Sequence, residues 1–292
     1  MVTAGIDVGS KNSKVVILKD GRVAARAIGS SGFEQSVVVR ELLQQALKEA
    51  GLERGDVAHM SATGVGRNVL EFADSSVTDV TAAARGANLL YPGATTVVEV
   101  GAEESRGIKT DGKGRVLDSA VNERCAAGSG SFTESMARAL GMSLTEFAQK
   151  SLESSVKIPM NAQCTVFAES EVVSLMHSGT EKKDISRAVH DAIASRVASM
   201  VRRVKLEGDV VLLGGLAYNP GFVRSLQDNL KVEELKIPEA PEFVDALGAA
   251  VVAAERAVAQ PPPQSAPRER NGRCLSRRKS SGAGKRAALS TL

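Results

Sequence analysis

Two cysteines precede segments of similar composition, and their thiols are candidate metal ligands. Cys125 is followed by the small residues 126–130. Cys164 lies 39 positions later in the chain and is followed by residues 165–171. Both segments are expected to start helices, where the helix dipole and the free N–H groups favour a thiolate over a thiol. For either cysteine taken alone, the alternative is a small buried hydrophobic side chain.

A [4Fe–4S] cluster normally needs four cysteine ligands. The chain has three cysteines, and Cys274 lies in a C-terminal tail of different character. A two-fold axis through the cluster would let each of two copies supply Cys125 and Cys164. The pattern therefore predicts a cluster-bridged dimer, with Cys274 as an incidental thiol.

The N-terminal residues 5–14 predict a phosphate site. They place an acid, Asp7, near the end of a strand and follow it with a tight turn. Backbone N–H groups and hydroxyls in such a β-hairpin bind phosphate oxygens, and a carboxylate is a hard ligand for Mg²⁺ or its waters. An ordinary Gly/Ser hairpin with a surface aspartate is the alternative. The candidate nucleotide-binding residues here are Gly9, Ser10, Lys11, Ser13 and Lys14.

Two later segments have the same form, a strand that leads into glycine. In residues 97–104 the turn carries several acids that are candidates to position an attacking water. In residues 210–219 a buried strand leads into a glycine pair, where a nucleotide can approach the backbone closely. The candidates in the first segment are Glu99, Gly101, Ala102, Glu103 and Glu104, and those in the second are Gly214, Gly215 and Asn219.

Together the three segments resemble the phosphate-1, phosphate-2 and adenosine motifs of the actin/Hsp70/sugar-kinase superfamily, over residues 3–258. The resemblance implies an α/β fold of two actin-like lobes, which are duplicated ribonuclease H-like domains, with ATP and Mg²⁺ between them. Because the last helix of this superfamily returns to the first lobe, lobe I is expected at 1–94 plus 242–259. Lobe II, with the cluster-binding helices, is expected at 95–241, and a basic tail at 260–292.

The cysteine segments resemble the cluster-binding motifs of a narrower group, the BadF/BadG/BcrA/BcrD-type ATPase family. This group includes the ATP-dependent activators of 2-hydroxyacyl-CoA dehydratases and the ATPase subunits of benzoyl-CoA reductases. The resemblance implies one [4Fe–4S] cluster per dimer and ATP-driven, one-electron transfer. A reduced ferredoxin or flavodoxin would donate the electron, and an acyl-CoA reductase or dehydratase would accept it. The other half of the cluster site would come from a second copy or from a related ATPase subunit.

The sequence departs from these families at the second phosphate segment. It has Glu99 where the superfamily usually has aspartate, and residues 101–104 replace the Gly-Gly-Gln typical of dehydratase activators. Residues 101–111 look more like the smaller ATPase subunit of benzoyl-CoA reductases. We therefore expect a benzoyl-CoA reductase subunit with Asp7, Glu99, Glu103 and Glu104 as catalytic candidates; which glutamate positions the water stays open.

Three alternatives remain at this point. The first is the activator of a 2-hydroxyacyl-CoA dehydratase, which uses the same chemistry. The second is a small-molecule kinase of the same superfamily, and the third is a non-catalytic actin-like assembly protein. The last two would leave Cys125 and Cys164 unexplained.

Hydrophobic periodicity and turn residues predict a fold that is repeated in outline. Each half opens with three short strands followed by helices. The expected strands are residues 3–8, 14–18, 23–28, 95–100, 107–110, 116–120 and 209–213. The expected helices are residues 33–50, 129–140, 165–177, 185–204 and 243–258, with another that starts at a capping box at 143–146.

Composition limits the classes of partner. Aromatic residues make up 3% of the chain and there is no Trp, which leaves little material for stacking on nucleic-acid bases. No apolar run approaches 18 residues, so a cytoplasmic protein without a membrane span is expected. Residues 261–292 carry eight Lys/Arg and one acid, and removing this +7 from the net charge of +3 leaves −4. This tail is expected to be disordered.

Other polar residues give weaker signals. Residues 62–68 form a Gly-rich segment that resembles a segment of the same ATPase family, but a simple turn before a helix explains it equally well. Glu169 and Glu171 are expected either to face the nucleotide or to lie on a solvated helix face. His59, His177 and His190 have no metal-ligand spacing, so structural roles are expected for them.

Overall fold

The computed structural model describes residues 1–122, 130–160 and 164–259. Cys125, Cys274 and the tail at 260–292 lie outside the described residues. Within the described ranges, no helix is long and apolar enough to cross a membrane.

The N-terminal half forms a five-stranded sheet in the order β3-β2-β1-β4-β5. β1 pairs antiparallel with β2 and parallel with β4. The first helix, α1 (Gln35–Glu49), buries Val39, Leu42 and Leu43 in a core that it shares with the sheet. The strands are β1 (Val2–Val8), β2 (Asn12–Lys19), β3 (Arg22–Ser30), β4 (Val57–Thr63) and β5 (Ser75–Ser76).

The second sheet repeats this pairing with four strands in the order β8-β7-β6-β9. Its central strand β6 pairs antiparallel with β7 and parallel with β9, as β1 does with β2 and β4. The repeated pairing confirms the duplicated outline expected from the sequence. The strands are β6 (Thr96–Val100), β7 (Ser105–Thr110), β8 (Val116–Asn122) and β9 (Val210–Leu213).

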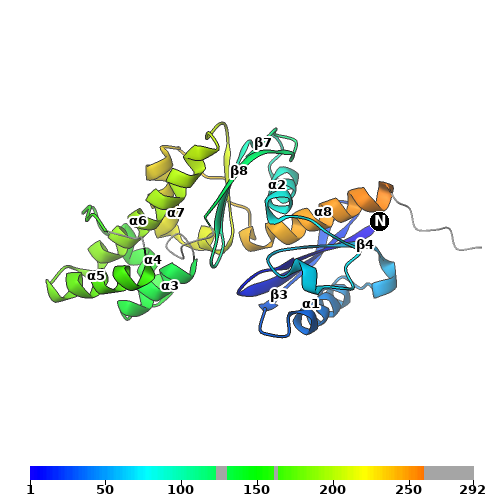
Figure 1. Ribbon diagram of the computed structural model, residues 1–292, viewed down its shortest axis with the longest axis horizontal. Helices are drawn as coiled ribbons and strands as arrows, with labels where there is room; N and C mark the ends of the chain where they lie inside the picture. The colour runs from blue at the N-terminus through cyan, green and yellow to red at the C-terminus, as the bar shows by residue number, and fades with distance from the viewer. Residues whose placement is uncertain (123–129, 161–163, 260–292) are drawn as a thin grey trace, which may run out of the picture. The chain divides into compact units, whose positions relative to one another are not determined.

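Five helices pack together beside the second sheet (Figure 1). Their shared core is centred on three fully buried aromatic side chains, Phe132, Phe147 and Phe222. Burial of side chains of this size supplies most of the stabilisation of such a layer. The helices are α3 (Gly130–Ala139), α4 (Leu144–Leu152), α5 (Thr165–His177), α6 (Lys182–Arg203) and α7 (Pro220–Leu230).

Two helices rich in small residues, α2 (Asp79–Leu90) and α8 (Val244–Ala259), lie side by side (Figure 1). Their backbones approach so closely that a Cβ at Gly248 would lie 1.8 Å from the Ala82 carbonyl oxygen. α8 also packs on the first sheet, where Thr3 Oγ1 donates to the Ala250 carbonyl at 3.0 Å. Short 3₁₀ helices complete the fold: η1 (Arg54–Asp56), η2 (Arg67–Val69), η3 (Gly215–Tyr218) and η4 (Pro241–Phe243).

Most expected elements lie within a few residues of their observed bounds, and α5 matches its expected range. The sequence analysis gave no bounds for β4, β5, α2 or α7. The lobe boundaries near residues 94 and 241 stay a prediction. Alanines of α2, which was assigned to lobe I, share a core with strands of the second sheet.

Candidate functional site

A cavity of about 560 Å³ lies where the central strands of the two sheets end. Asp7 and Glu99 each lie one residue before the end of the central strand, β1 and β6 respectively, and both line the cavity. The other predicted residues that line it are Gly9, Ser10, Lys11, Lys14, Gly101, Ala102, Glu103, Glu104, Gly214, Gly215 and Asn219. The structure therefore brings together side chains from three separate segments.

Ser13 was predicted to bind phosphate, but it does not line the cavity. It is fully buried on β2, with its Oγ 2.9 Å from Ser31 Oγ. Ser31 in turn donates to the Gly9 carbonyl at 2.7 Å. Because the single hydroxyl proton of Ser31 goes to Gly9, Ser13 is the donor to Ser31, and its hydroxyl supports the hairpin from within.

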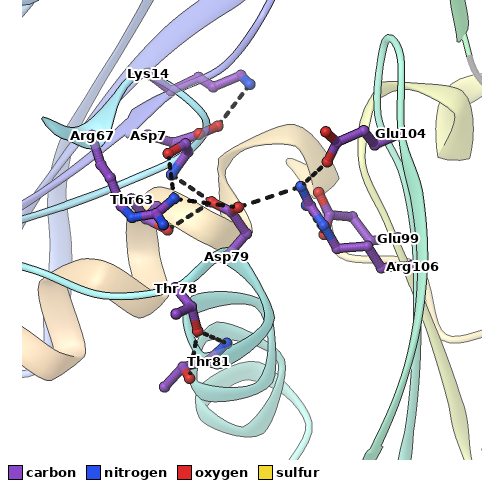
Figure 2. Close-up of polar contacts among 11 residues, drawn as sticks. Asp7, Lys14, Thr63, Arg67, Thr78, Asp79, Thr81, Glu99, Glu104 and Arg106 are labelled. Carbon is purple, nitrogen blue, oxygen red and sulfur yellow. Dashed lines mark hydrogen bonds and ion pairs between the residues drawn. The ribbon is translucent and has the colours of Figure 1, made fainter. Parts of the chain in front are cut away.

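Asp7 forms a buried ion pair with Lys14 (Figure 2). The two residues are cross-strand partners in the β1–β2 hairpin, and Lys14 Nζ lies 2.8 Å from Asp7 Oδ2. Burial raises the pKa of Asp7, although the Lys14 charge opposes this shift. Burial also disfavours the charge on Lys14, but the carboxylates around it, Asp7 first among them, together outweigh that effect, and the pKa of Lys14 is raised.

Arg106 on β7 holds a group of carboxylates (Figure 2). Its guanidinium donates to Glu99 at 2.8 Å and to Glu104 at 2.5 Å, and lies 3.5 Å from Asp79. The side chain is only 9% exposed. Burial opposes its charge, but the carboxylates, Glu99 first among them, raise its pKa. Arg106 therefore stays cationic and fixes the acids of the second phosphate segment.

Asp79, the first residue of α2, contacts both the turn after β4 in the first sheet and Arg106 in the second sheet. Its Oδ1 accepts from Thr63 Oγ1 at 3.0 Å and from the Gly64 N–H at 2.5 Å. Gly64 has φ +89°, and a Cβ there would lie 2.5 Å from Asp7 Oδ1, so glycine is needed at this position. Asp79 thus fixes the turn after β4 while its other oxygen faces Arg106.

Asp245, near the start of α8, is a buried acid in the cavity wall. Burial raises its pKa well above the usual value, and the neighbouring Glu99 and Asp7 carboxyls raise it further. Its Oδ1 has no hydrogen-bond partner among the described residues. A protonated Asp245 reduces the repulsion in this group of acids.

The charge of the cavity bears on which ligand it can hold. Within the described part of the chain, its lining has eight acidic residues and three basic ones. A polyphosphate entering this site needs a cation to offset the acid excess. No group of three or more His, Cys, Asp or Glu suited to a metal ion occurs among the described residues. Mg²⁺ does not need such a group, because it is usually held by one or two carboxylates, phosphate oxygens and waters. The carboxylates of the cavity, Asp7 above all, fit that role.

The two glycines after β9 differ in their surroundings: Gly214 packs against β6, whereas Gly215 borders open space. Gly214 has φ +87°, and a Cβ there would lie 2.2 Å from the Val100 carbonyl oxygen, so its close neighbour is β6 rather than a ligand. A Cβ at Gly215 would meet nothing within 4 Å. Asn219 caps α7 through its Oδ1, which accepts from the Phe222 N–H at 3.0 Å.

Cys164 directly precedes α5, as expected from the sequence. Its thiol is free and half-buried. The adjacent Val166 and Phe167 are 65% and 70% exposed, which is unusual for large apolar side chains in a first helical turn. Cys125 lies outside the described residues, so the predicted pairing of the two thiols in one metal site stays a prediction.

Two histidines have internal partners. His59 Nε2 lies 2.9 Å from Ser75 Oγ, and His190 Nδ1 lies 2.7 Å from the Ser186 carbonyl oxygen. Burial lowers the pKa of His190 to about 4, so it is neutral at physiological pH. Neither Glu169 nor Glu171 is part of the described cavity lining.

Three residues of the site were missed by sequence reasoning: Asp79, Arg106 and Asp245. They come from α2, β7 and α8. Arg106 lies within the stretch 101–111 noted in the sequence analysis, but no role was assigned to it, and Asp79 and Asp245 lie outside the phosphate-type motifs. Only Asp79 carried a usable signal, since Thr78-Asp79 is a typical start of a helix and Thr78 Oγ1 does accept from the Thr81 N–H.

Relatives of known function share nearly the full length of this fold. An activator of lactoyl-CoA dehydratase from Anaerotignum propionicum is 40% identical, over 88% of this chain and 99% of its own. A benzoyl-CoA reductase subunit from Thauera aromatica is 31% identical, over 87% of this chain and 94% of its own.

Solved structures agree. (R)-2-hydroxyglutaryl-CoA dehydratase component A of Acidaminococcus fermentans matches with a TM-score of 0.84 at 36% identity, covering 88% of this chain and 99% of that one. The Clostridium difficile activator of 2-hydroxyisocaproyl-CoA dehydratase, with bound ADPNP, matches with a TM-score of 0.82 at 35% identity, covering 89% and 96%. These matches confirm the two-lobed, actin-like α/β fold. The sequence profile of one family spans residues 4–253, and the chain belongs to it: the BadF/BadG/BcrA/BcrD ATPase family.

Proposed function

We propose that this chain is an ATP-hydrolysing, iron–sulfur electron-transfer protein that activates a 2-hydroxyacyl-CoA dehydratase. The observation that carries the proposal is the acid-lined cavity between the ends of β1 and β6, where Asp7 and Glu99 face a space suited to a Mg²⁺–nucleotide complex. A similar activator has the ATP analogue ADPNP bound.

The choice of acceptor differs from our primary expectation. Residues 101–111 favoured a benzoyl-CoA reductase, but dehydratase activators share 36–40% of residues with this chain, against 31% for the benzoyl-CoA reductase subunit of Thauera aromatica. Whole-chain identity weighs more than one turn, so a dehydratase is the preferred acceptor. Benzoyl-CoA reductase remains the second candidate on the strength of that turn.

The residues of the cavity support distinct roles in ATP hydrolysis. Asp7 would hold Mg²⁺ or its waters. Arg106 already engages Glu99 and Glu104, whereas Glu103 is exposed, lines the cavity and lies outside those ion pairs. Glu103 is therefore our first candidate to orient the attacking water, with Glu99 and Glu104 positioned by Arg106.

The cysteines would supply the electron-transfer site. Cys125 and Cys164 from each of two copies, or from this chain and a related ATPase subunit, would bind one [4Fe–4S] cluster. The cluster would accept one electron from reduced ferredoxin or flavodoxin and pass it to the acyl-CoA enzyme. Hydrolysis of one or more ATP molecules would accompany each transfer.

Anaerobic purification of the full chain tests the cluster. We expect four iron and four sulfide per dimer in the wild type. Cys125→Ser and Cys164→Ser should each abolish the cluster, while Cys274→Ser serves as the matched control and should keep it. Full iron content in either of the first two variants would rule out the assignment.

Reconstitution tests the acceptor. The loaded protein, with ATP and a reduced ferredoxin, is added either to a 2-hydroxyacyl-CoA dehydratase or to the catalytic subunits of a benzoyl-CoA reductase that lack their own ATPase subunits. Activation of the dehydratase supports the proposal. If the loaded protein activates the reductase and not the dehydratase, the second candidate is selected. If it hydrolyses ATP but activates neither enzyme, both candidate acceptors are contradicted.

A further inference from the structure

An ion pair joins the N-terminal hairpin to α3 across the cavity. Lys11, in the turn between β1 and β2, contacts both carboxylate oxygens of Glu134 on α3 at 2.5 Å. Both residues line the cavity. Their side chains are 48% and 34% exposed.

This pair differs from the other ion pairs of the cavity in its exposure. Lys14 and Arg106 are 15% and 9% exposed, and each is paired with a carboxylate of its own sheet, Asp7 and Glu99 respectively. A half-exposed pair of flexible side chains contributes little, because water screens it and ordering the side chains costs entropy. Lys11 is thus the cavity cation that a phosphate group can most easily draw away from its partner. Lysine binds phosphate well as a mobile point charge.

α3, the helix that carries Glu134, is also attached to the turn after β6, at Gly101 and Ala102. The first N–H groups of α3, at Gly130 and Ser131, donate to the carbonyls of Gly101 and Ala102, each at 2.9 Å. α3 therefore contacts both predicted phosphate segments, one through backbone hydrogen bonds and the other through Glu134. The ion pair to Lys11 is the weaker of the two attachments.

From this arrangement we infer that Glu134 determines how the protein distinguishes a nucleoside triphosphate from a diphosphate, by competing with the terminal phosphate for Lys11. Without a terminal phosphate, Lys11 stays paired with Glu134. With a triphosphate, Lys11 Nζ moves to the terminal phosphate and Glu134 is released to solvent. The inference rests on the proposed function, since it takes the cavity to be the nucleotide site.

A double-mutant cycle tests the competition. The full chain is titrated anaerobically with Mg·ADPNP and with Mg·ADP, as wild type, Glu134→Gln, Lys11→Met and the double variant. In the wild type, binding of the triphosphate must break the Lys11–Glu134 pair. Glu134→Gln should therefore tighten ADPNP binding about 1.5- to 5-fold, the equivalent of one exposed ion pair. ADP binding should not change.

Lys11→Met removes the ligand for which the two groups compete. ADPNP binding should weaken about tenfold, as for a lost charge-assisted hydrogen bond, with ADP again unchanged. In this background Glu134→Gln should have no further effect on either nucleotide. Glu153→Gln is the matched control, because Glu153 pairs with Lys150 on α4 at similar exposure and does not line the cavity. It should leave both affinities unchanged.

Two results would overturn the inference. If Glu134→Gln tightens ADP and ADPNP binding equally, with or without Lys11, Glu134 is only a repulsive charge. If it changes neither affinity in the wild-type background, the pair is a surface contact without a role in binding. If the wild type binds neither nucleotide, the proposed function itself fails, and the two failures are thereby distinguished.

Discussion

Asp245→Asn gives the sharpest test of the electrostatics of the cavity. Asp245 is 8% exposed and lies among Glu99, Asp7 and Arg106, and burial raises its pKa well above the usual 3.8. Asparagine keeps the size of the side chain and removes its titration. We expect the variant to be more stable than the wild type at neutral pH, because it removes the cost of keeping a carboxyl in this place.

The size and sign of the effect follow from proton linkage. Between pH 3.8 and the raised pKa, folded Asp245 holds a proton that the unfolded chain has released. Its stabilising contribution is fully present below the unfolded pKa and is lost as the pH rises. The loss is about 1.4 kcal/mol per pH unit for one proton. The gain of Asp245→Asn over the wild type should therefore increase by up to about 1.4 kcal/mol per pH unit from pH 5 as far as the raised pKa.

Denaturant unfolding of the nucleotide-free full chain at pH 5, 6 and 7 measures this difference. Asp118→Asn is the control, because Asp118 is exposed on β8 and its removal should leave the pH profile of the wild type unchanged. Parallel profiles for the wild type and Asp245→Asn would show that Asp245 titrates normally in the folded protein. The account of the acid group would then be wrong.

Three other changes test separate parts of the site. Asp7→Asn should lower the rate of Mg·ATP hydrolysis on the order of 10- to 100-fold, the effect of losing a group that orients a metal ion or its waters, without loss of iron; an unchanged rate would exclude this role. Arg106→Met should lower the free energy of unfolding by about 3 kcal/mol, because it leaves the buried Glu99 unpaired, while Arg106→Lys should lose less; equal stability of both variants in urea would contradict the ion-pair network. Deletion of residues 261–292 should leave ATPase activity and iron content intact, and a loss of either would give that segment a function.

The sequence predicted the repeated strands well but missed one region of the first half. Hairpins such as β1–β2 carry alternating apolar residues and turn glycines, which are local signals. β4 has a broken alternation, because His59 and Ser61 interrupt its apolar residues, and the buried face of α2 is built mainly from alanine and glycine. α2 reads Asp-Val-Thr-Ala-Ala-Ala-Arg-Gly-Ala-Asn-Leu-Leu, and Gly86 allows it to touch α8.

The cavity was predicted as far as its motifs extend. Asp7, Glu99 and the glycine turns are contiguous in sequence with the strands that place them, so the strand–turn motifs and the family resemblance indicated them. Asp245 acts through neighbours from distant elements, and only the folded chain makes them neighbours. Arg106 reaches Asp79 in the same way, although its partners Glu99 and Glu104 belong to its own β6–β7 hairpin. Ser13 failed for a related reason. Successive side chains of a strand face opposite sides, so Ser13 faces the core, where it contacts Ser31, while the next residue, Lys14, lines the cavity.

The placement of α3 bears on how ATP hydrolysis would reach the cluster. A helix attached to one turn alone would move rigidly with that turn, and nucleotide binding at the other would not affect it. α3 is attached to the Gly101–Ala102 turn by backbone hydrogen bonds and to the N-terminal hairpin through Glu134. It also directly follows, in sequence, the segment that contains Cys125. A nucleotide shifts such a helix only by its differential affinity for two arrangements. If Lys11 leaves Glu134 for a terminal phosphate, that difference arises at this ion pair. The presence or absence of the terminal phosphate then changes how firmly α3, the helix that follows Cys125 in the sequence, is attached.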